Sequence, residues 1–274
     1  MNTSRVLTVA RTDLRQLYQA KDFWGPMVGL GALFFLVIPT VLLLIITRVD
    51  DAGIAQQIAT TLEVLPQAAQ DAVQGDTPQA QAGYALAVYL FAPVAIVVPL
   101  TISTAVGSST IVGERERGTG EFLAHSPAPV REIYLGKLIA SLAPGLLTVF
   151  VGFGVYAVIV NTLVGPDVGG WFFPTTQWWV LMLWVVPPVL GLTLSLVLRL
   201  SARVKSTAAA QQASGLISLP MILIAYSQST GALYTGIVVS WTIGAIAWVA
   251  AAFALTRGMR AVTRARLLGV ADEA

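Results

Sequence analysis

Long apolar runs without a charged residue dominate this sequence. The uncharged runs cover residues 23–47, 77–113, 138–166, 168–198 and 206–256. A helix that crosses a membrane needs roughly 20 apolar residues, so each of the first four runs is long enough for one span. The fifth run is too long for one helix, and the glycines and small polar residues of 227–236 divide it as a turn does. The pattern predicts six membrane-spanning helices in an all-α, polytopic membrane protein.

The basic residues divide cleanly between the two sides of this six-span arrangement. Six spans place both termini on one side of the membrane, and fifteen of the sixteen Lys and Arg residues fall on that side. Only Arg48 falls on the other side, together with acidic residues such as Asp50 and Asp51. Because basic loops are retained in the cytoplasm, we expect cytoplasmic termini and a multi-pass protein of the cell membrane. With five or seven spans, the basic residues would be distributed over both sides of the membrane.

The segments outside the spans complete a single predicted transmembrane domain. Its parts are a cytoplasmic interfacial helix at 1–22, a six-helix membrane domain at 23–257, an external loop at 48–83, a cytoplasmic hinge at 113–137 and a cytoplasmic tail at 258–274. The first span is expected to be a retained helix, because its apolar core is longer than that of a signal peptide and no small-residue cleavage site follows it.

The N-terminal segment has the pattern of an amphipathic helix over residues 3–21. Its apolar positions are Val6, Leu7, Ala10, Leu14, Leu17 and Tyr18. Arginine and lysine residues lie between them, and Thr3 or Ser4 is placed to cap the helix. Such a helix lies along the membrane surface, where it either anchors the chain or contacts a partner protein.

Two segments on the expected outer side leave their roles open. In the loop, apolar residues recur at steps of three or four, namely Ile54, Ile58, Leu62, Leu65, Ala69 and Val73. They predict a helix broken at Pro66, which either shields an outer gate or rests on the bilayer. The aromatic run at 171–179 is interpreted as an interfacial belt, with a stacking platform for substrate as the alternative.

Composition removes several classes of function. Hydrophobic residues make up 56% of the chain and charged residues only 11%, far below the roughly 25% of soluble domains. There is no cysteine, which excludes disulfides and thiol chemistry, and the single histidine, His125, excludes an imidazole-rich metal centre. A net charge of +2 does not indicate nucleic-acid binding. No cofactor is expected.

The hinge concentrates eight charged residues between positions 111 and 137. Gly118 is a helix terminator, so we expect the second span to continue through 114–117 and to end there. Thr119 is placed to cap a short helix over residues 120–125, with Glu121 in its first turn. Ser126 and Pro127 are expected to end that helix and to start the next one. The result is a helix–short helix–helix elbow.

The whole hinge string, GERERGTGEFLAHSPAPVREIYLGK, resembles the hinge of ABC-2-type transporter permeases. That family has Gly-Glu-x-Glu-x-Gly-Thr, an apolar short helix, Ser/Thr-Pro, a basic residue and Leu-Gly-Lys, and its short helix is a coupling helix that docks on an ATPase subunit. The resemblance assigns this contact to Gly113, Glu114, Glu116, Gly118, Thr119, Glu121, Phe122, Leu123, Ser126 and Pro127. It also implies a second permease copy or a related permease, and export as the usual direction. Gly120 departs from the family, which has an apolar helix former there.

Three classes of function remain to be compared. Gly136-Lys137 lacks the preceding glycine and following hydroxyl of a P-loop, so an ATP-driven transporter needs a separate ATPase subunit and this chain is no enzyme. A secondary transporter or channel is the alternative, but all 14 acidic residues lie outside the six expected spans, which disfavours proton coupling. A membrane enzyme would need a histidine or aspartate at membrane depth to activate a nucleophile. The sequence favours the permease.

Overall fold

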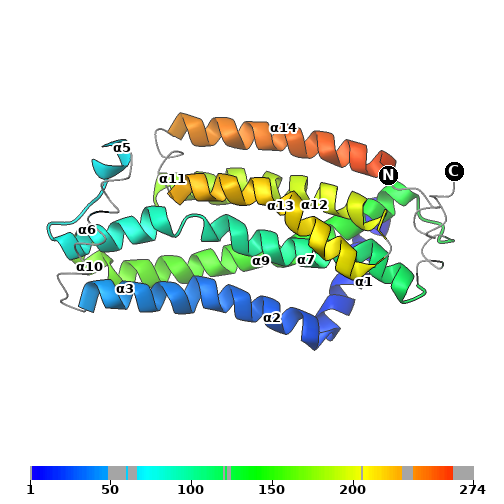
Figure 1. The fold of residues 1–274 in the computed structure, drawn as a ribbon, viewed down its shortest axis with the longest axis horizontal. Helices are drawn as coiled ribbons and strands as arrows, with labels where there is room; N and C mark the ends of the chain where they lie inside the picture. The colour runs from blue at the N-terminus through cyan, green and yellow to red at the C-terminus, as the bar shows by residue number, and fades with distance from the viewer. Residues whose placement is uncertain are drawn as a thin grey trace.

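The computed structural model describes residues 2–48, 60, 67–119, 121, 125–204, 206–229 and 237–261. Every regular element in these ranges is a helix, which confirms the predicted all-α class. The long helices run side by side along the longest axis of the molecule, and α1 (Thr3–Gln19) crosses one end of the bundle (Figure 1).

Five stretches of described helix are long and apolar enough to cross a membrane. In chain order they are α2 (Lys21–Ala32) with the π-helical turn η1 (Leu33–Val37) and α3 (Ile38–Arg48); α6 (Pro78–Ala85) with η2 (Leu86–Leu90) and α7 (Val94–Glu116); α9 (Val130–Leu163); α11 (Thr176–Val180) with η3 (Leu181–Val185) and α12 (Val186–Ser201); and α14 (Ile237–Ala261). The helix α13 (Thr207–Ser229) occupies the place of the fifth expected span but is not among these five. The count of six therefore stays a prediction.

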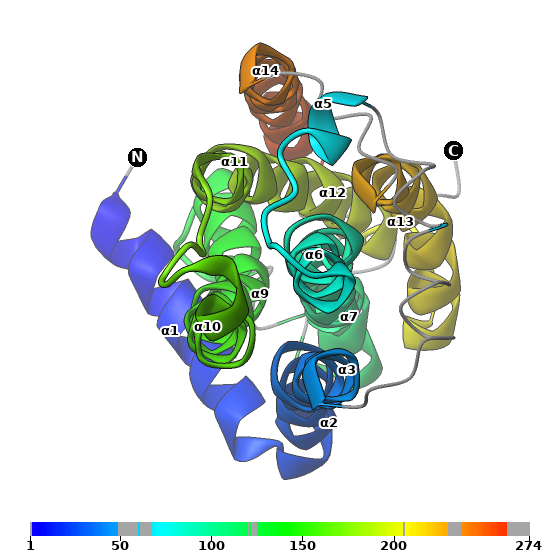
Figure 2. The same cartoon turned by 90° about the vertical axis from the view of Figure 1, so that its left-hand side faces the viewer.

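The second span lies at the centre of the bundle. Seen along the bundle, α7 lies among α9, α12 and α13, with α3 on one side and α14 farther out on the other (Figure 2). In the most apolar window of this span 67% of the residues are buried, against 17% for α14. Close helix crossings depend on small residues: a Cβ atom at Gly145 of α9 would lie 2.7 Å from the carbonyl oxygen of Pro99 in α7. The outer helices leave their apolar side chains for lipid.

The helical hydrogen-bond ladder of the second span is broken where η2 meets α7. The Phe91 amide donates to the Leu86 carbonyl at 3.0 Å, and the Ala92 amide donates to Tyr89 at 3.2 Å. In a regular α-helix these amides would donate hydrogen bonds to the carbonyls of Ala87 and Val88. The side chains of Tyr156 and Trp178 supply donors instead, at 2.8 Å to Ala87 and 2.9 Å to Val88. A break in a membrane helix persists only where such partners exist.

The aromatic run at 171–179 divides into a buried and an exposed part. Phe173 and Trp178 are buried against each other with ring centroids 4.9 Å apart, whereas Trp171 is 71% exposed. The buried side chain of Asn161 holds the run in place by accepting from the amides of Phe172 and Phe173 at 2.9 and 3.0 Å. The belt interpretation therefore fits the exposed tryptophan but is wrong for the buried pair, which belongs to the core.

Most helix boundaries agree with the sequence, and some do not. Thr77, the first residue of the second uncharged run, caps α6 through its side chain. The cap of α1 is Asn2, which accepts from the Ser4 amide at 3.0 Å, so the expectation of Thr3 or Ser4 was wrong. Asn is an equally good cap, so propensity did not decide between them.

Parts of the segments that are expected on the outer side can also be placed. Two short helices, α5 (Gln67–Gln70) and α10 (Gly165–Val168), belong to them. Of the apolar residues in the loop, Ala69 is buried, while those at 54, 58, 62 and 65 lie outside the described residues, as does Pro66. The turn predicted at 227–236 begins later than expected, because α13 continues through Ser229.

Candidate functional site

The second span ends at the hinge in the way its glycine predicts. Helix α7 ends at Glu116, and Gly118 adopts a left-handed conformation with φ of 73°. The Thr119 amide then donates to the carbonyl of Glu114 at 2.9 Å, which is the six-to-one bond of a Schellman C-cap. The Thr119 hydroxyl also donates to the carbonyl and to the carboxylate of Glu114. The cap thus fixes the orientation of the Glu114 side chain.

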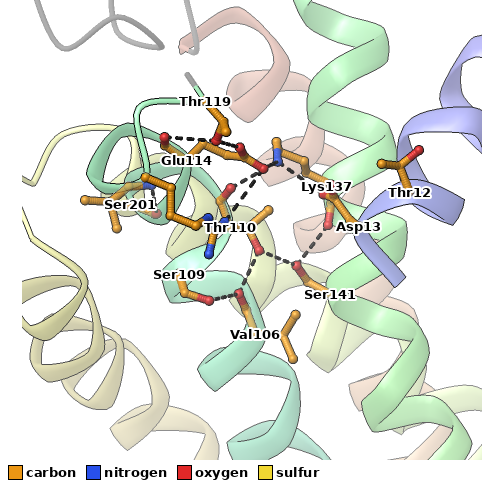
Figure 3. A network of polar contacts seen from close by, with 12 residues as sticks. Thr12, Asp13, Val106, Ser109, Thr110, Glu114, Thr119, Lys137, Ser141 and Ser201 are labelled. Carbon is orange, nitrogen blue, oxygen red and sulfur yellow. Dashed lines mark hydrogen bonds and ion pairs between the residues drawn. The ribbon is translucent and has the colours of Figure 1, made fainter. Parts of the chain in front are cut away.

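A buried lysine joins three helices beside this cap (Figure 3). Lys137 of α9 is 1% exposed, and its Nζ donates to Asp13 Oδ2 of α1 at 3.1 Å. The other acceptors belong to α7: the Thr110 carbonyl at 3.1 Å and Glu114 Oε1 at 3.3 Å. An ammonium group has three donors, and here each has an oxygen partner. Burial of the charge is therefore compensated, and α1, α7 and α9 share one ionic contact.

The carboxylates of this network have different surroundings. Burial raises the pKa of the Asp13 carboxyl group above its usual value, and the attraction of Lys137 for the ionised form opposes that shift. Glu114 also lies 3.8 Å from the Arg117 guanidinium group. A pocket of about 210 Å³ opens beside the network between α1, α7 and α9, and Gln16 and Ser109 contribute to its lining. The network is therefore buried on one side and accessible from the pocket.

Close packing of α1 on α9 makes the ionic contact between Lys137 and Asp13 possible. A Cβ atom at Gly136 would lie 2.6 Å from Val9 Cβ and 2.9 Å from the carbonyl oxygen of Val6. Val6 and Ala10 are buried on this side of α1, whereas Leu7 and Tyr18 are exposed. Only glycine at position 136 allows α1 to approach so closely.

Glu116, in the last turn of α7, binds the start of another helix. Its Oε1 accepts from the Thr207 amide at 2.9 Å, and its Oε2 accepts from the Thr207 hydroxyl at 2.8 Å. Thr207 is the first residue of α13, so the carboxylate also interacts favourably with the helix dipole. The end of α7 and the start of α13 are held together.

The far end of the hinge is held by α1. Helix α9 begins at Val130 after Pro129, so the expectation that Pro127 starts the next helix was wrong. Arg5 donates to the Pro127 carbonyl at 3.5 Å, and the Asn2 amide donates to Glu132 Oε1 at 2.6 Å.

The helical start at Val130 brings charged residues of the hinge into a long helix. Lys137 and the buried Glu132 lie in the first turns of a candidate span, as Glu114 lies at the end of another. These candidate spans are whole helices, and a helix of 34 residues is longer than the roughly 20 residues that cross a membrane, so the expectation that all acidic residues lie outside the membrane stays a prediction. A charged residue remains in a membrane helix where it is paired, and the missed pairs involve α1, which is distant in sequence.

The residues assigned by resemblance fall partly within the described chain. Those described are Gly113, Glu114, Glu116, Gly118, Thr119, Glu121, Ser126 and Pro127. Phe122 and Leu123 lie outside the described residues, as do Gly120 and Ala124, so most of the predicted short helix is untested. The His125 amide donates to the Glu121 carbonyl at 3.0 Å, which has the spacing of one helical turn. Gly113 is buried next to Arg117.

Sequence reasoning missed the roles of Asp13, Lys137 and Glu132. One signal was available, since Asp13 is the single acidic residue in an otherwise basic α1. From the sequence, Lys137 was considered only as part of the Gly136-Lys137 pair of a possible P-loop. Within the described ranges, no three His, Asp or Glu side chains are grouped to hold a metal ion.

The long apolar helices fit a multi-pass membrane protein. Its family follows from comparison with known proteins. The family model described as "ABC-2 family transporter protein" matches residues 7–236, and the chain belongs to that family. It is thus an ABC transporter permease, a membrane transport subunit. Comparison with curated proteins gave no match.

Proposed function

We propose that this chain is the membrane subunit of an ATP-driven exporter and that a separate ABC ATPase subunit docks on the hinge at 113–137. The observation that supports this most is the linkage of the hinge to several helices. Lys137 joins α9 to α1 and α7, and Glu116 joins α7 to α13. A partner that displaces the hinge would therefore move these helices together, which is what coupling of ATP hydrolysis to transport requires.

The docking contact is proposed for the short helix. Its apolar residues Phe122 and Leu123 are the anchors that would enter a groove on the ATPase, and Glu121 would lie at the rim of the contact. The residues before them fix the start of the hinge: the Schellman cap at Gly118 and Thr119 sets the direction in which the chain leaves α7. Ser126 and Pro127 would set the direction in which the chain runs back toward α9.

The remaining parts of the proposal concern topology and partners. Both termini and the hinge are placed in the cytoplasm, and the protein in the cell membrane, because the basic residues gather on that side. A second permease, identical or related, would complete the substrate path. The alternative function is a secondary transporter or channel, which would need no ATPase and would tolerate changes on the hinge.

The experiment compares Leu123→Arg with a matched change in the tail, Leu267→Arg. Both add the same charge on the expected cytoplasmic side, so a mere topological marker would tolerate both. Each variant is co-expressed with the ABC ATPase encoded nearest to its gene, and co-purification and transport-linked ATP turnover are measured. We expect Leu123→Arg to lose both, because an apolar anchor is worth about 2 kcal/mol or more, while Leu267→Arg keeps both. Normal ATPase binding by Leu123→Arg would reject the coupling role.

A further inference from the structure

A charged groove lies at the same end of the bundle as the hinge, away from the Lys137 network. It has a volume of about 410 Å³ and lies between the first turn of α9 and the last turns of α14. Its lining residues are Pro129, Arg131, Glu132, Thr256, Met259 and Arg260. Val130 begins one candidate span and Arg260 ends another, so the groove lies at the ends of two helices that are long enough to cross a membrane.

The groove offers both positive and negative charge. Arg131 and Arg260 are exposed, and guanidinium groups are well suited to phosphate oxygens. Helix α9 also begins here without a side-chain cap, which adds the positive end of a helix dipole. Glu132 supplies the opposite charge in the same groove. A ligand that carries an anion and a cation a few bonds apart would match both charges.

Glu132 is a buried carboxylate with one oxygen that lacks a hydrogen-bond donor among the described residues. It is 4% exposed, and its Oε1 accepts from the Asn2 amide, but its Oε2 has no hydrogen-bond donor among the described residues. The nearest cation is the Arg5 guanidinium group at 4.0 Å, beyond hydrogen-bonding distance. A buried carboxylate oxygen without a donor is costly. Glu132 lines the groove, so a small movement of its side chain would bring Oε2 to a donor bound there and remove that cost.

We propose that this groove binds the headgroup of an aminophospholipid, phosphatidylethanolamine being the simplest. The phosphate lies between Arg131 and Arg260, and the primary ammonium group donates to Glu132 Oε2. The acyl chains follow α14, where Val249 and Phe253 are exposed and share a helix face with Thr256 and Arg260 by their spacing. An anionic lipid without an amine would bring its charge beside Glu132 and leave Oε2 without a donor. The groove uses the last part of the hinge, beyond the short helix that is proposed to contact the ATPase.

The test uses the full chain in detergent and native mass spectrometry with three dioleoyl lipids. Phosphatidylethanolamine carries a donating ammonium, phosphatidylcholine the same phosphate with a quaternary ammonium that cannot donate, and phosphatidylglycerol no amine. We expect phosphatidylethanolamine to bind about tenfold more tightly than the other two, as a hydrogen bond to a charged group implies. Equal binding of phosphatidylglycerol would overturn the proposal.

Two variants assign the contacts. Arg260→Gln removes an exposed phosphate partner and is expected to weaken phosphatidylethanolamine binding about tenfold, whereas Arg203→Gln, an exposed arginine outside the groove, leaves binding unchanged. Glu132→Gln keeps an acceptor for the Asn2 amide and is expected to abolish the preference among lipids. If Glu132→Gln fails to fold, Arg260→Gln decides, and its unchanged binding would overturn the proposal.

A soluble competitor distinguishes headgroup recognition from general association with lipid. Glycerophosphoethanolamine, which has the headgroup without acyl chains, is expected to displace bound phosphatidylethanolamine, and glycerophosphoglycerol is not. Equal displacement by both compounds, or by neither, would contradict recognition of the amine.

Discussion

At the α6 end of the second span the contacts are neutral and enclosed, whereas at the Glu114 end they are ionic and open to a pocket. Tyr156 and Trp178 donate to backbone carbonyls within a cluster of buried rings, while Lys137 holds two carboxylates next to a cavity of about 210 Å³. Neutral hydrogen bonds in a packed core have one good arrangement. Ion pairs beside a pocket respond to pH and to a charged partner. The α6 end of the second span is therefore the fixed end, and the Glu114 end is the one that a partner can move.

The largest effect is expected at the fixed end, from Trp178→Ala. The change removes a ring that is 1% exposed and the donor to the Val88 carbonyl. Loss of a buried aromatic side chain costs about 3–5 kcal/mol, and the lost hydrogen bond adds to that. Thermal unfolding in detergent should show a strongly lowered midpoint, whereas Trp171→Ala, which removes an exposed ring, leaves it nearly unchanged. A similar midpoint for both variants would contradict a packed aromatic end.

The next effect is expected at the ionic end, from Lys137→Met. It leaves Asp13 and Glu114 facing each other without their shared cation, and breaking a buried ion pair costs about 3 kcal/mol. Lys21→Met, at an exposed lysine, is the control for lost charge. Adding Asp13→Asn and Glu114→Gln to Lys137→Met should restore part of the stability because it removes the repulsion. No recovery in the triple variant would show that the ion pairs do not govern this end.

A smaller effect is expected where the ionic end contacts α13. Glu116→Ala removes the acceptor for the Thr207 amide and hydroxyl, and loss of such a cap costs about 1 kcal/mol. Glu116→Gln keeps one acceptor and should lose less. If α13 is driven through this contact, ATP turnover linked to transport falls more than the midpoint of unfolding does. Proportional losses would assign Glu116 a purely structural role.

The smallest effect is the pH dependence that Asp13 contributes. Its pKa is raised in the folded protein above the usual value of 3.8, so the folded state holds the proton to a higher pH than the unfolded state does. Asp13 therefore stabilises the fold less as pH rises from 3.8 through the folded pKa. The stability of Asp13→Asn relative to the wild type should rise over that window, as thermal unfolding at several pH values would show. The opposite slope would mean that attraction by Lys137 outweighs burial.

Local features of this molecule could be predicted from the sequence, while long-range pairings could not. The end of α7 before Gly118 depends on a capping residue that acts within a few positions. The pairing of Lys137 with Asp13 joins residues 124 positions apart, and no periodicity encodes it. Burial of Phe173 and Trp178 was missed for a related reason. An aromatic residue at a membrane interface and one in a core have the same local pattern.

The contact of α1 with α9 has a consequence for the order of events during synthesis. Asp13 and Val6 are made early, but their partners Lys137 and Gly136 follow more than 100 residues later. At roughly 5–20 residues per second, α1 waits on the order of ten seconds before its binding surface exists. During that time the helix has only the lipid surface for its apolar side. The N-terminal helix is thus made first, and it docks on the bundle only after the start of the third span has been made.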